Sequence, residues 1–425
     1  MSEAVPLAYA DLKILQVESP TIAGHTCKVI RVAPPGVNFG TLFETVAKRI
    51  KDVPELHWKL GTKDRAPAWV KDKKFRLERH LVAYDFSHPV PVDQLNGIVS
   101  NLFSQRLDRD YPLWQIDVVN LDDGGAALIW RIHHALADGT TAMRLGRELL
   151  WEESATPGAT VPAKSREAIR EADNVRRRAH LIHLFEHEFK RSKGPSPFDG
   201  HIGTEREIAF ATISLSDLHD SAKSSCGATL NDAVLSLVAG SLRQWLDVHH
   251  ETHLGDIRVK VPVSLHHGDG DGANLDSYFL LPLPVNEPDP VKRLAEIHDG
   301  TGLRKSEHDA EELDALLKRL NHTSARLTRY YSKFEKDPRR FALNVSNVRG
   351  PHTDVTILGS QVESIHSIVE IADRHALRVA VVSLGDRLCF GFCADPELVA
   401  DLGVMADGVE VEAERLHTAA SPASA

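Results

Sequence analysis

The sequence contains 425 residues, of which 26% are charged and 42% are hydrophobic. A chain of this length is too long for one ordinary hydrophobic core and suits two domains, and its composition is typical of folded proteins, which excludes an intrinsically disordered chain. The formal net charge of −10 argues against a nucleic-acid-binding protein, because phosphate backbones are bound by clustered cationic side chains.

The four cysteines indicate a reducing compartment, because Cys27, Cys226, Cys389 and Cys393 are too few and too scattered to form a disulfide framework. Cys389 and Cys393 stand four residues apart in an alternating segment, so both thiols are expected on one face of a buried strand. No further Cys or His at finger-like spacing accompanies them, so we predict no metal site.

No segment of the sequence resembles a targeting signal or a membrane anchor. The first residues lack a basic region followed by an apolar core, and no stretch approaches the ~20 apolar residues that a membrane-spanning helix needs. We therefore expect a cytoplasmic protein that is neither secreted by a standard signal nor membrane-spanning, with peripheral contact to the inner face of the membrane left open.

The first part of the chain alternates between strand and helix patterns. His25 to Val32 is typical of a strand, and Leu42 to Ile50 carries helical spacing. A helix-like segment from Val92 to Leu107 follows, and Gln115 to Asn120 and Ala126 to His133 are two strands separated by a turn rich in Asp and Gly. The pattern predicts an α/β lobe whose last two strands form a hairpin.

Composition changes after this lobe, where Pro and Gly stand among small residues and the apolar period is lost. We predict a first lobe over residues 1–155, a linker over residues 156–204 and a second lobe over residues 205–425. Within the linker, Arg176 to Lys193 predicts a basic amphipathic helix. Such a helix can dock on an anionic lipid surface or guide a phosphate-bearing substrate, or it can pack between the lobes with its basic face in solvent.

The second lobe repeats the α/β pattern without a close sequence repeat. Ile208 to Leu215 is strand-like, and Asn231 to Leu246 predicts a long helix. Further strands are predicted at Val259 to Leu265 and Phe341 to Val348, and Arg378 to Cys393 predicts a hairpin.

A pair of adjacent histidines, His133 and His134, ends the second strand of the first hairpin. Alternation along a strand places His134 with Trp130 and Ile132 on one face and His133 with Arg131 on the other. Histidines that point apart are a poor chelating pair, so we expect one of them to be available for chemistry while its neighbour packs.

Asp138 and Gly139 mark the junction between this strand and a helix that runs from Thr140 to Trp151. Gly139 permits an abrupt turn. Asp138 can cap the helix, can anchor the turn through a salt bridge so that His134 points correctly, or can do both. Because an unperturbed histidine titrates near pH 6.5, such a residue can take a proton from an alcohol and return it to a leaving group, as acyl transfer requires.

The segment His133-His134-Ala135-Leu136-Ala137-Asp138-Gly139 belongs to a wider set of motifs. It follows Pro112-Leu113-Trp114 and precedes Asn231-Asp232, Val261-Pro262-Val263-Ser264-Leu265 and Asn344-Val345-Ser346-Asn347-Val348-Arg349-Gly350-Pro351. In composition and order the set resembles the bacterial wax ester synthase/acyl-CoA:diacylglycerol acyltransferase (WS/DGAT) family, over roughly residues 5 to 415. The histidine motif alone is shared with chloramphenicol acetyltransferase-like enzymes and peptide-synthetase condensation domains.

The resemblance implies an α/β fold of two chloramphenicol acetyltransferase-like lobes, each a mixed sheet flanked by helices, with a substrate tunnel between them. It also implies that His134 is the catalytic base, supported by His133, Asp138 and Gly139. By the same resemblance, eight further residues shape the substrate-binding walls: Pro112, Leu113, Trp114, Asn231, Asp232, Ser346, Asn347 and Gly350.

Several of these residues also have structural interpretations. Asp232 follows Thr229 by three positions, as in a capping box, and Trp114 can simply close a loop over the core. The chain departs from the family at Arg349, where the family usually has proline. Arg349 can meet a phosphate of CoA or can be a solvated loop residue.

The implied reaction is transfer of a long-chain fatty acyl group from acyl-CoA to a lipid hydroxyl, either diacylglycerol or a fatty alcohol. Acyl-CoA is then a co-substrate, no cofactor is needed, and peripheral association with a membrane or lipid-droplet surface is expected. Other hydroxyl or amine acceptors, a non-catalytic acyl-lipid-binding protein and a metal hydrolase using His133, His134 and Asp138 remain the alternatives.

Overall fold

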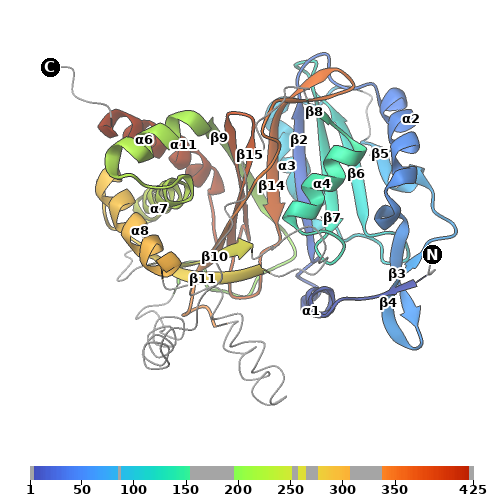
Figure 1. The fold of residues 1–425 in the computed structure, drawn as a ribbon, viewed down its shortest axis with the longest axis horizontal. Coiled ribbons are helices and arrows are strands. Elements are labelled where there is room, and N and C mark those ends of the chain that lie inside the picture. Colours follow the sequence, from blue (N-terminus) through green and yellow to red (C-terminus); the bar gives the residue numbers. More distant parts are fainter. Residues whose placement is uncertain are drawn as a thin grey trace.

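Two lobes lie side by side in the computed structural model, which describes residues 4–84, 88–153, 196–250, 257–264, 276–306 and 337–420 (Figure 1). The predicted basic helix Arg176 to Lys193 and most of the predicted linker lie outside these ranges. Each lobe is built on a mixed β-sheet flanked by helices, which confirms the predicted α/β class.

The sheet of the first lobe has seven strands, and all neighbours in it are antiparallel except the pair β5 and β6. Its order is β5 (Leu81–Ala83), β6 (Trp114–Asn120), β7 (Ala126–His133), β2 (His25–Val32), β14 (Ser360–Val369), β13 (Val355–Ile357) and β8 (Glu152–Glu153). The predicted hairpin is formed by β6 and β7. Two of the seven strands, β13 and β14, come from the second half of the chain.

Helices cover both faces of this sheet, so the side chains of its central strands are buried on both sides. On one face, α2 (Phe39–Arg49) and α4 (Gly139–Leu149) pack against strand residues such as Ile30 and Trp130. On the other face, α3 (Leu95–Ser104) packs against residues such as Val29 and Ile129 and joins the core of the second lobe. A single 3₁₀ turn, Val92–Gln94, precedes α3.

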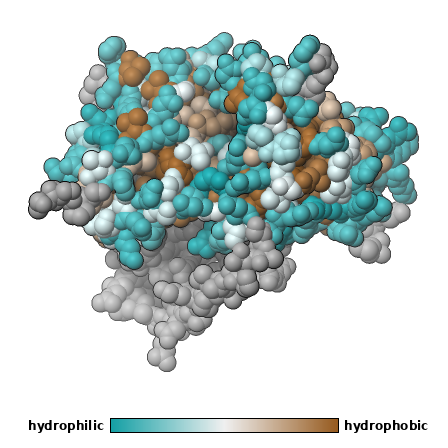
Figure 2. All heavy atoms as spheres, turned by 90° about the horizontal axis from the view of Figure 1, so that it is seen from above, coloured by the Kyte–Doolittle hydropathy of each residue, from teal (hydrophilic) through white to brown (hydrophobic). Residues whose placement is uncertain are grey.

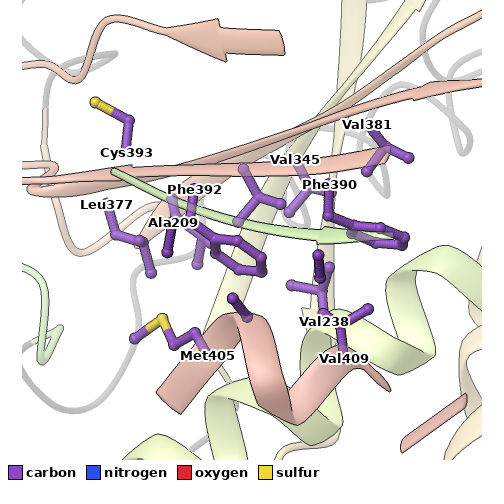
Figure 3. Packing of buried hydrophobic residues seen from close by; sticks show 14 of the residues in the cluster. Ala209, Val238, Val345, Leu377, Val381, Phe390, Phe392, Cys393, Met405 and Val409 are labelled. Atoms are coloured by element: carbon purple, nitrogen blue, oxygen red, sulfur yellow. The ribbon is translucent and has the colours of Figure 1, made fainter. Parts of the chain in front are cut away.

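The sheet of the second lobe has six strands. Its order is β11 (Asp276–Leu283), β10 (Ile257–Ser264), β12 (Leu343–Val348), β15 (Leu377–Leu384), β16 (Arg387–Ala394) and β9 (Glu207–Ser214), with β12 parallel to both of its neighbours. The helices of this lobe are α6 (Leu215–Cys226), α7 (Leu230–Val248), α8 (Pro290–Ser306) and α11 (Leu402–Ala420), and α11 contacts the other three. Figure 3 shows Phe390 and Phe392 pointing toward α7 and α11.

A smaller sheet and helix α1 complete the N-terminal part of the chain. The sheet contains β1 (Ala4–Pro6), β4 (Ala66–Lys71) and β3 (Trp58–Lys63), all antiparallel. Helix α1 (Tyr9–Val17) follows β1. Short 3₁₀ helices at Ile50–Asp52, Pro54–His57 and Leu77–Arg79 connect the remaining elements.

Cys389 and Cys393 lie on one face of β16, as predicted, together with Gly391. Both thiols are buried, and burial raises their pKa values. Burial likewise raises the pKa of Cys27 to about 12. These three thiols are therefore protonated and unreactive at neutral pH.

The surface shown in Figure 2 is mostly hydrophilic, with hydrophobic patches separated by polar side chains. Among the described residues, no helix combines the length and the apolar character that crossing a bilayer demands. The large apolar side chains lie mainly inside the two lobes.

The lobes meet where β14 of the first sheet crosses β15 and β16 of the second. A Cβ atom on Gly391 of β16 would overlap the backbone carbonyl oxygen of Ser367 on β14. The absence of a side chain at this position therefore sets how closely the two sheets approach.

Substitution of Gly391 by alanine should lower the free energy of unfolding by about 1–3 kcal/mol, because the backbone of β14 cannot yield without disturbing the junction. Gly97 of α3 is the matched control, because a Cβ there meets no atom within 4 Å. Gly97→Ala should be neutral or stabilising by up to about 1 kcal/mol. Urea unfolding of both variants measures the difference, and equal stability of the two would contradict this account of the junction.

Candidate active site

The end of β7 is held from both sides by its neighbouring strands. The backbone N–H of His133 donates to the carbonyl of Leu113, with an N–O distance of 2.9 Å, just before β6. The N–H of His134 donates to the carbonyl of Gly24, at 3.0 Å, just before β2. The backbone of the histidine pair is therefore fixed in the plane of the sheet.

The Pro112-Leu113-Trp114 motif acts on this backbone and on the core beneath it. All three residues are buried. The Trp114 indole Nε1 donates to the carbonyl of Leu56 at 2.8 Å, and its ring stacks on His80. The structure thus gives the motif a supporting contact to His133, through the Leu113 carbonyl.

The side chain of His133 is buried and both of its ring nitrogens are occupied. Nδ1 accepts a hydrogen bond from the backbone N–H of Ala135 at 3.1 Å, so the ring proton sits on Nε2. Nε2 donates it to Oε1 of Glu18 at 2.8 Å, and Oε2 of Glu18 pairs with Arg109 at 2.6 Å. His133 therefore has no nitrogen available for a substrate.

The side chain of His134 lines a cavity of about 450 Å³ at the junction of the lobes. The first lobe contributes residues from α1, from the segment that leads into β2 and from the end of β14, and the second contributes residues from β10, β12 and β15. His133 is not part of this lining. Strand alternation correctly predicted that the two histidines face different surroundings.

The surroundings keep the His134 imidazole neutral. Burial lowers its pKa to about 4, and the positive charge of Arg378 acts in the same direction, while its own carbonyl and Asp138 partly oppose the shift. Its Nδ1 is buried and has no hydrogen-bond partner among the described residues. At neutral pH the imidazole of His134 is therefore uncharged, with one unprotonated nitrogen, and it lines the cavity.

Asp138 caps α4: its Oδ1 accepts a hydrogen bond from the backbone N–H of Thr141 at 2.6 Å. Of the two contacts predicted for Asp138, a helix cap and a salt bridge, the structure contains the cap. Within the described ranges Asp138 forms no ion pair. The charge of Asp138 acts on the buried Lys28: burial lowers the pKa of Lys28 to about 8, and Asp138 partly opposes that shift. Gly139 begins α4 against the second lobe, where a Cβ would lie 2.9 Å from Cγ2 of Val348.

Strand β12 brings its motif to the same junction. Asn344, Ser346 and Val348 share one face by alternation; Asn344 lines the cavity and Val348 packs at Gly139, so Ser346 lies between them. Asn347 lies on the other face and is exposed.

Gly350 lies beyond the end of β12, at the next strand. Its N–H donates to the Ser383 hydroxyl at 3.2 Å, and a side chain at this position would overlap the Ser383 carbonyl. Gly350 thus fixes the end of the motif against β15.

Asn231 and Asp232 lie at the start of α7 and do not line the cavity. Asp232 completes the predicted capping box with Thr229 and accepts hydrogen bonds from His298 at 2.9 Å and from Thr301 at 2.6 Å. Burial raises the pKa of Asp232, but these hydrogen bonds outweigh it and hold the pKa below its usual value. Asp232 therefore joins α7 to α8.

Several residues at the cavity carried no role in the sequence analysis. Arg378 and Asn344 are paired across β15 and β12, a neighbourhood that sequence spacing does not reveal. His25 also lines the cavity, and its Nε2 donates to the Phe103 carbonyl at 2.7 Å. Within the described residues, no group of three His, Cys, Asp or Glu side chains is arranged to hold a metal ion.

Comparison with known proteins gives matches along both lobes. Residues 7–191 match the wax ester synthase/diacylglycerol acyltransferase catalytic domain, and residues 273–417 match the WS/DGAT C-terminal domain. A Mycobacterium tuberculosis protein named as a probable diacylglycerol O-acyltransferase is 28% identical over 83% of this chain and 81% of its own length. The O-acyltransferase WSD of Acinetobacter baylyi is 25% identical over 77% of this chain and 78% of its own.

Solved structures show the same fold. The wax ester synthase/diacylglycerol acyltransferase from Marinobacter aquaeolei VT8 superposes with a TM-score of 0.73 at 22% identity, over 98% of this chain and 100% of that one. The first condensation domain of the calcium-dependent antibiotic synthetase has a TM-score of 0.62 at 17% identity, over 100% of this chain and 98% of the other.

The two-lobed fold places the chain in the structural class that contains the solved WS/DGAT and the condensation domain, as the family resemblance implied. Within that class, the chain belongs to the WS/DGAT family, whose two domain models together cover most of it. It is an acyltransferase.

If His134 exchanges a proton during turnover, the pH dependence of turnover should reflect its neutral imidazole. Because its pKa is lowered to about 4, the ring stays unprotonated at neutral pH, and kcat/KM should fall only as the pH drops through about 4 to 5. Arg378→Gln should move this acidic limb to higher pH, because the positive charge that disfavours imidazolium is lost. Arg339→Gln, at an exposed position, is the control and should leave the limb in place. A limb near pH 6.5 in the unsubstituted enzyme would contradict this assignment.

Proposed function

We propose that this enzyme transfers a long-chain acyl group from acyl-CoA to a lipid hydroxyl and that His134 is the general base. The observation that carries the proposal is the contrast between the two histidines: His134 meets the cavity as a neutral ring, whereas both nitrogens of His133 are occupied. Of these two residues, His134 alone can accept a proton from a substrate without first losing a hydrogen bond.

The lining of the cavity fits both parts of an acyl-CoA. Apolar side chains of Ile14, Val17 and Ile22 can contact an acyl chain, and the cations Lys260 and Arg378 can favour an anionic group. The acceptor is proposed from the names of the relatives, which are a diacylglycerol O-acyltransferase and a wax ester synthase. Diacylglycerol and fatty alcohols are the acceptors those names indicate.

In the proposed reaction, an imidazole nitrogen of His134 takes the acceptor hydroxyl proton as that oxygen attacks the thioester carbonyl carbon. The carbon–sulfur bond then breaks, and the imidazolium protonates the departing CoA sulfur. A thiol with a pKa of about 8.5 is a good leaving group, so positioning of the two substrates supplies much of the acceleration. Asp138 and Gly139 serve by fixing the turn that presents His134.

We also propose that the protein works in peripheral contact with a membrane or lipid-droplet surface, because its proposed acceptors reside there. The basic segment Arg176 to Lys193 supplies the positive charge that an anionic lipid surface attracts. Co-flotation with vesicles containing anionic lipid, and its loss in high salt, are the expected results.

Replacement of the base should abolish most turnover. His134→Ala should lower kcat for palmitoyl-CoA with hexadecanol or dioleoylglycerol by about 10²–10⁴-fold, because the group proposed to take the hydroxyl proton is removed. His133→Ala should be milder, because it removes only support. Release of free CoA measures both, and circular dichroism verifies that each variant is folded. If His134→Ala kept near wild-type turnover, the proposal would be wrong, and turnover with amines alone would indicate a different acceptor class.

Direct transfer also predicts the absence of an acyl-enzyme. None of the buried thiols Cys27, Cys389 and Cys393 lines the cavity, and their raised pKa values disfavour the thiolate. Rapid-quench mixing with radiolabelled palmitoyl-CoA should therefore yield no labelled protein on the time scale of one turnover. Labelled protein that decays at the rate of product formation would indicate nucleophilic catalysis instead.

A further inference from the structure

A buried carboxylate lies behind the histidine motif, at a position to which neither the sequence motifs nor the reaction assigns a role. Glu18 is the residue at the C-terminal end of α1, and its side chain is 7% exposed. One carboxylate oxygen accepts the Nε2–H of His133 at 2.8 Å, and the other pairs with Arg109 at 2.6 Å. Burial raises the pKa of Glu18, but the contacts with His133 and Arg109 outweigh it, so the pKa lies below its usual value and the group is ionised at neutral pH.

The carboxylate determines which ring nitrogen of His133 carries the proton. An ionised Glu18 accepts hydrogen bonds only, so it selects the tautomer with hydrogen on Nε2. That tautomer leaves Nδ1 free to accept the N–H of Ala135 at 3.1 Å. With the proton on Nδ1, two donors would face each other, and the turn after His134 would lose this contact.

The segment from Glu18 to Gly24 contacts the chain on both sides of His134. Glu18 acts through His133 on Ala135, and the Gly24 carbonyl accepts the N–H of His134 itself at 3.0 Å. Gly24 has a φ of +73°, and a Cβ there would lie 2.8 Å from both Nε2 of His133 and Cγ of Glu18. The pairing of carboxylate and imidazole therefore needs glycine at this position.

The same segment continues into a wall of the cavity. Lys13, Ile14 and Val17 of α1 line it, and Glu18 directly follows the helix. If a bound substrate displaced α1, the side chain of Glu18 would therefore transmit the displacement to His133.

We propose that Glu18 is a positioning residue, which holds the catalytic turn through the tautomer of His133 and links the α1 wall of the cavity to His134. This inference rests on the proposed role of His134 as the base. Glu18 itself does not line the cavity and touches no reacting atom.

A double-mutant cycle tests whether Glu18 acts through His133. Glu18→Ala should lower kcat by about 10–100-fold with a smaller change in KM for acyl-CoA. Glu18→Gln, which keeps an acceptor oxygen and the side-chain volume, should recover most of that loss and serves if the alanine variant does not fold. Combined with His133→Ala, Glu18→Ala should add less than about twofold, because residues that act as one unit have non-additive effects. If the losses of kcat caused by Glu18→Ala and His133→Ala multiplied in the double variant, the two residues would act independently and the proposal would be wrong.

The tautomer of His133 supplies a readout independent of activity. In the ¹⁵N spectrum of the histidine-labelled full chain, the signal that disappears in His133→Ala should show a neutral ring protonated at Nε2, and Glu18→Ala should shift it toward a mixture of tautomers. Glu55→Ala, which removes a partly exposed carboxylate paired with Arg144, is the matched control and should change neither kcat nor this signal. An unchanged tautomer in Glu18→Ala would refute the positioning role. If His134→Ala remained active while Glu18→Ala altered the tautomer, the proposed base would be wrong and the coupling would stand.

Discussion

Consecutive residues of an extended chain point to opposite faces of a sheet, and the arrangement of the active site depends on this constraint at the end of β7. It sends His133 into a buried pocket and His134 into the cavity between the lobes. Each imidazole then meets a different environment: one is fully hydrogen bonded, and the other has a nitrogen without a described partner. Two chemically identical side chains differ in their hydrogen bonding because the backbone between them is extended.

Residues of the second lobe also affect the properties of His134. Arg378 lies beside the cavity, and its own pKa is lowered by burial to about 10, so it remains charged at neutral pH. Burial of His134 and, to a smaller extent, the charge of Arg378 lower the pKa of His134 and keep its imidazole neutral. Val348 and Asn344 of β12 bring the second sheet against the start of α4 and into the cavity lining. The proposed base therefore belongs to one lobe, while the neighbours that affect its pKa belong to both.

Local patterns were sufficient to predict most individual elements and the direction of the motif side chains. The hairpin of β6 and β7, the cap at Asp138 and the capping box at Thr229 follow from neighbours within a few residues, and all are present. Two contacts join residues that are distant in sequence: the cross-strand pair of Asn344 and Arg378, and the hydrogen bond between Glu18 and His133. The spacing of apolar residues along the chain does not predict such pairs. The motif order indicated the family but could not show that Asp232 lies with α8 and away from the cavity.

The entry of β14 into the first sheet affects how the chain can fold. Strand β2, which stands beside the histidine-bearing strand, has β14 as its other neighbour, and β14 is made only after residue 360. Until β14 is made, β2 is the edge strand of an incomplete sheet. Its backbone groups on that side are unpaired and its apolar side chains are not yet covered, which favours aggregation. The first lobe cannot close during synthesis of its own residues, so formation of the catalytic junction must wait for most of the second lobe to emerge.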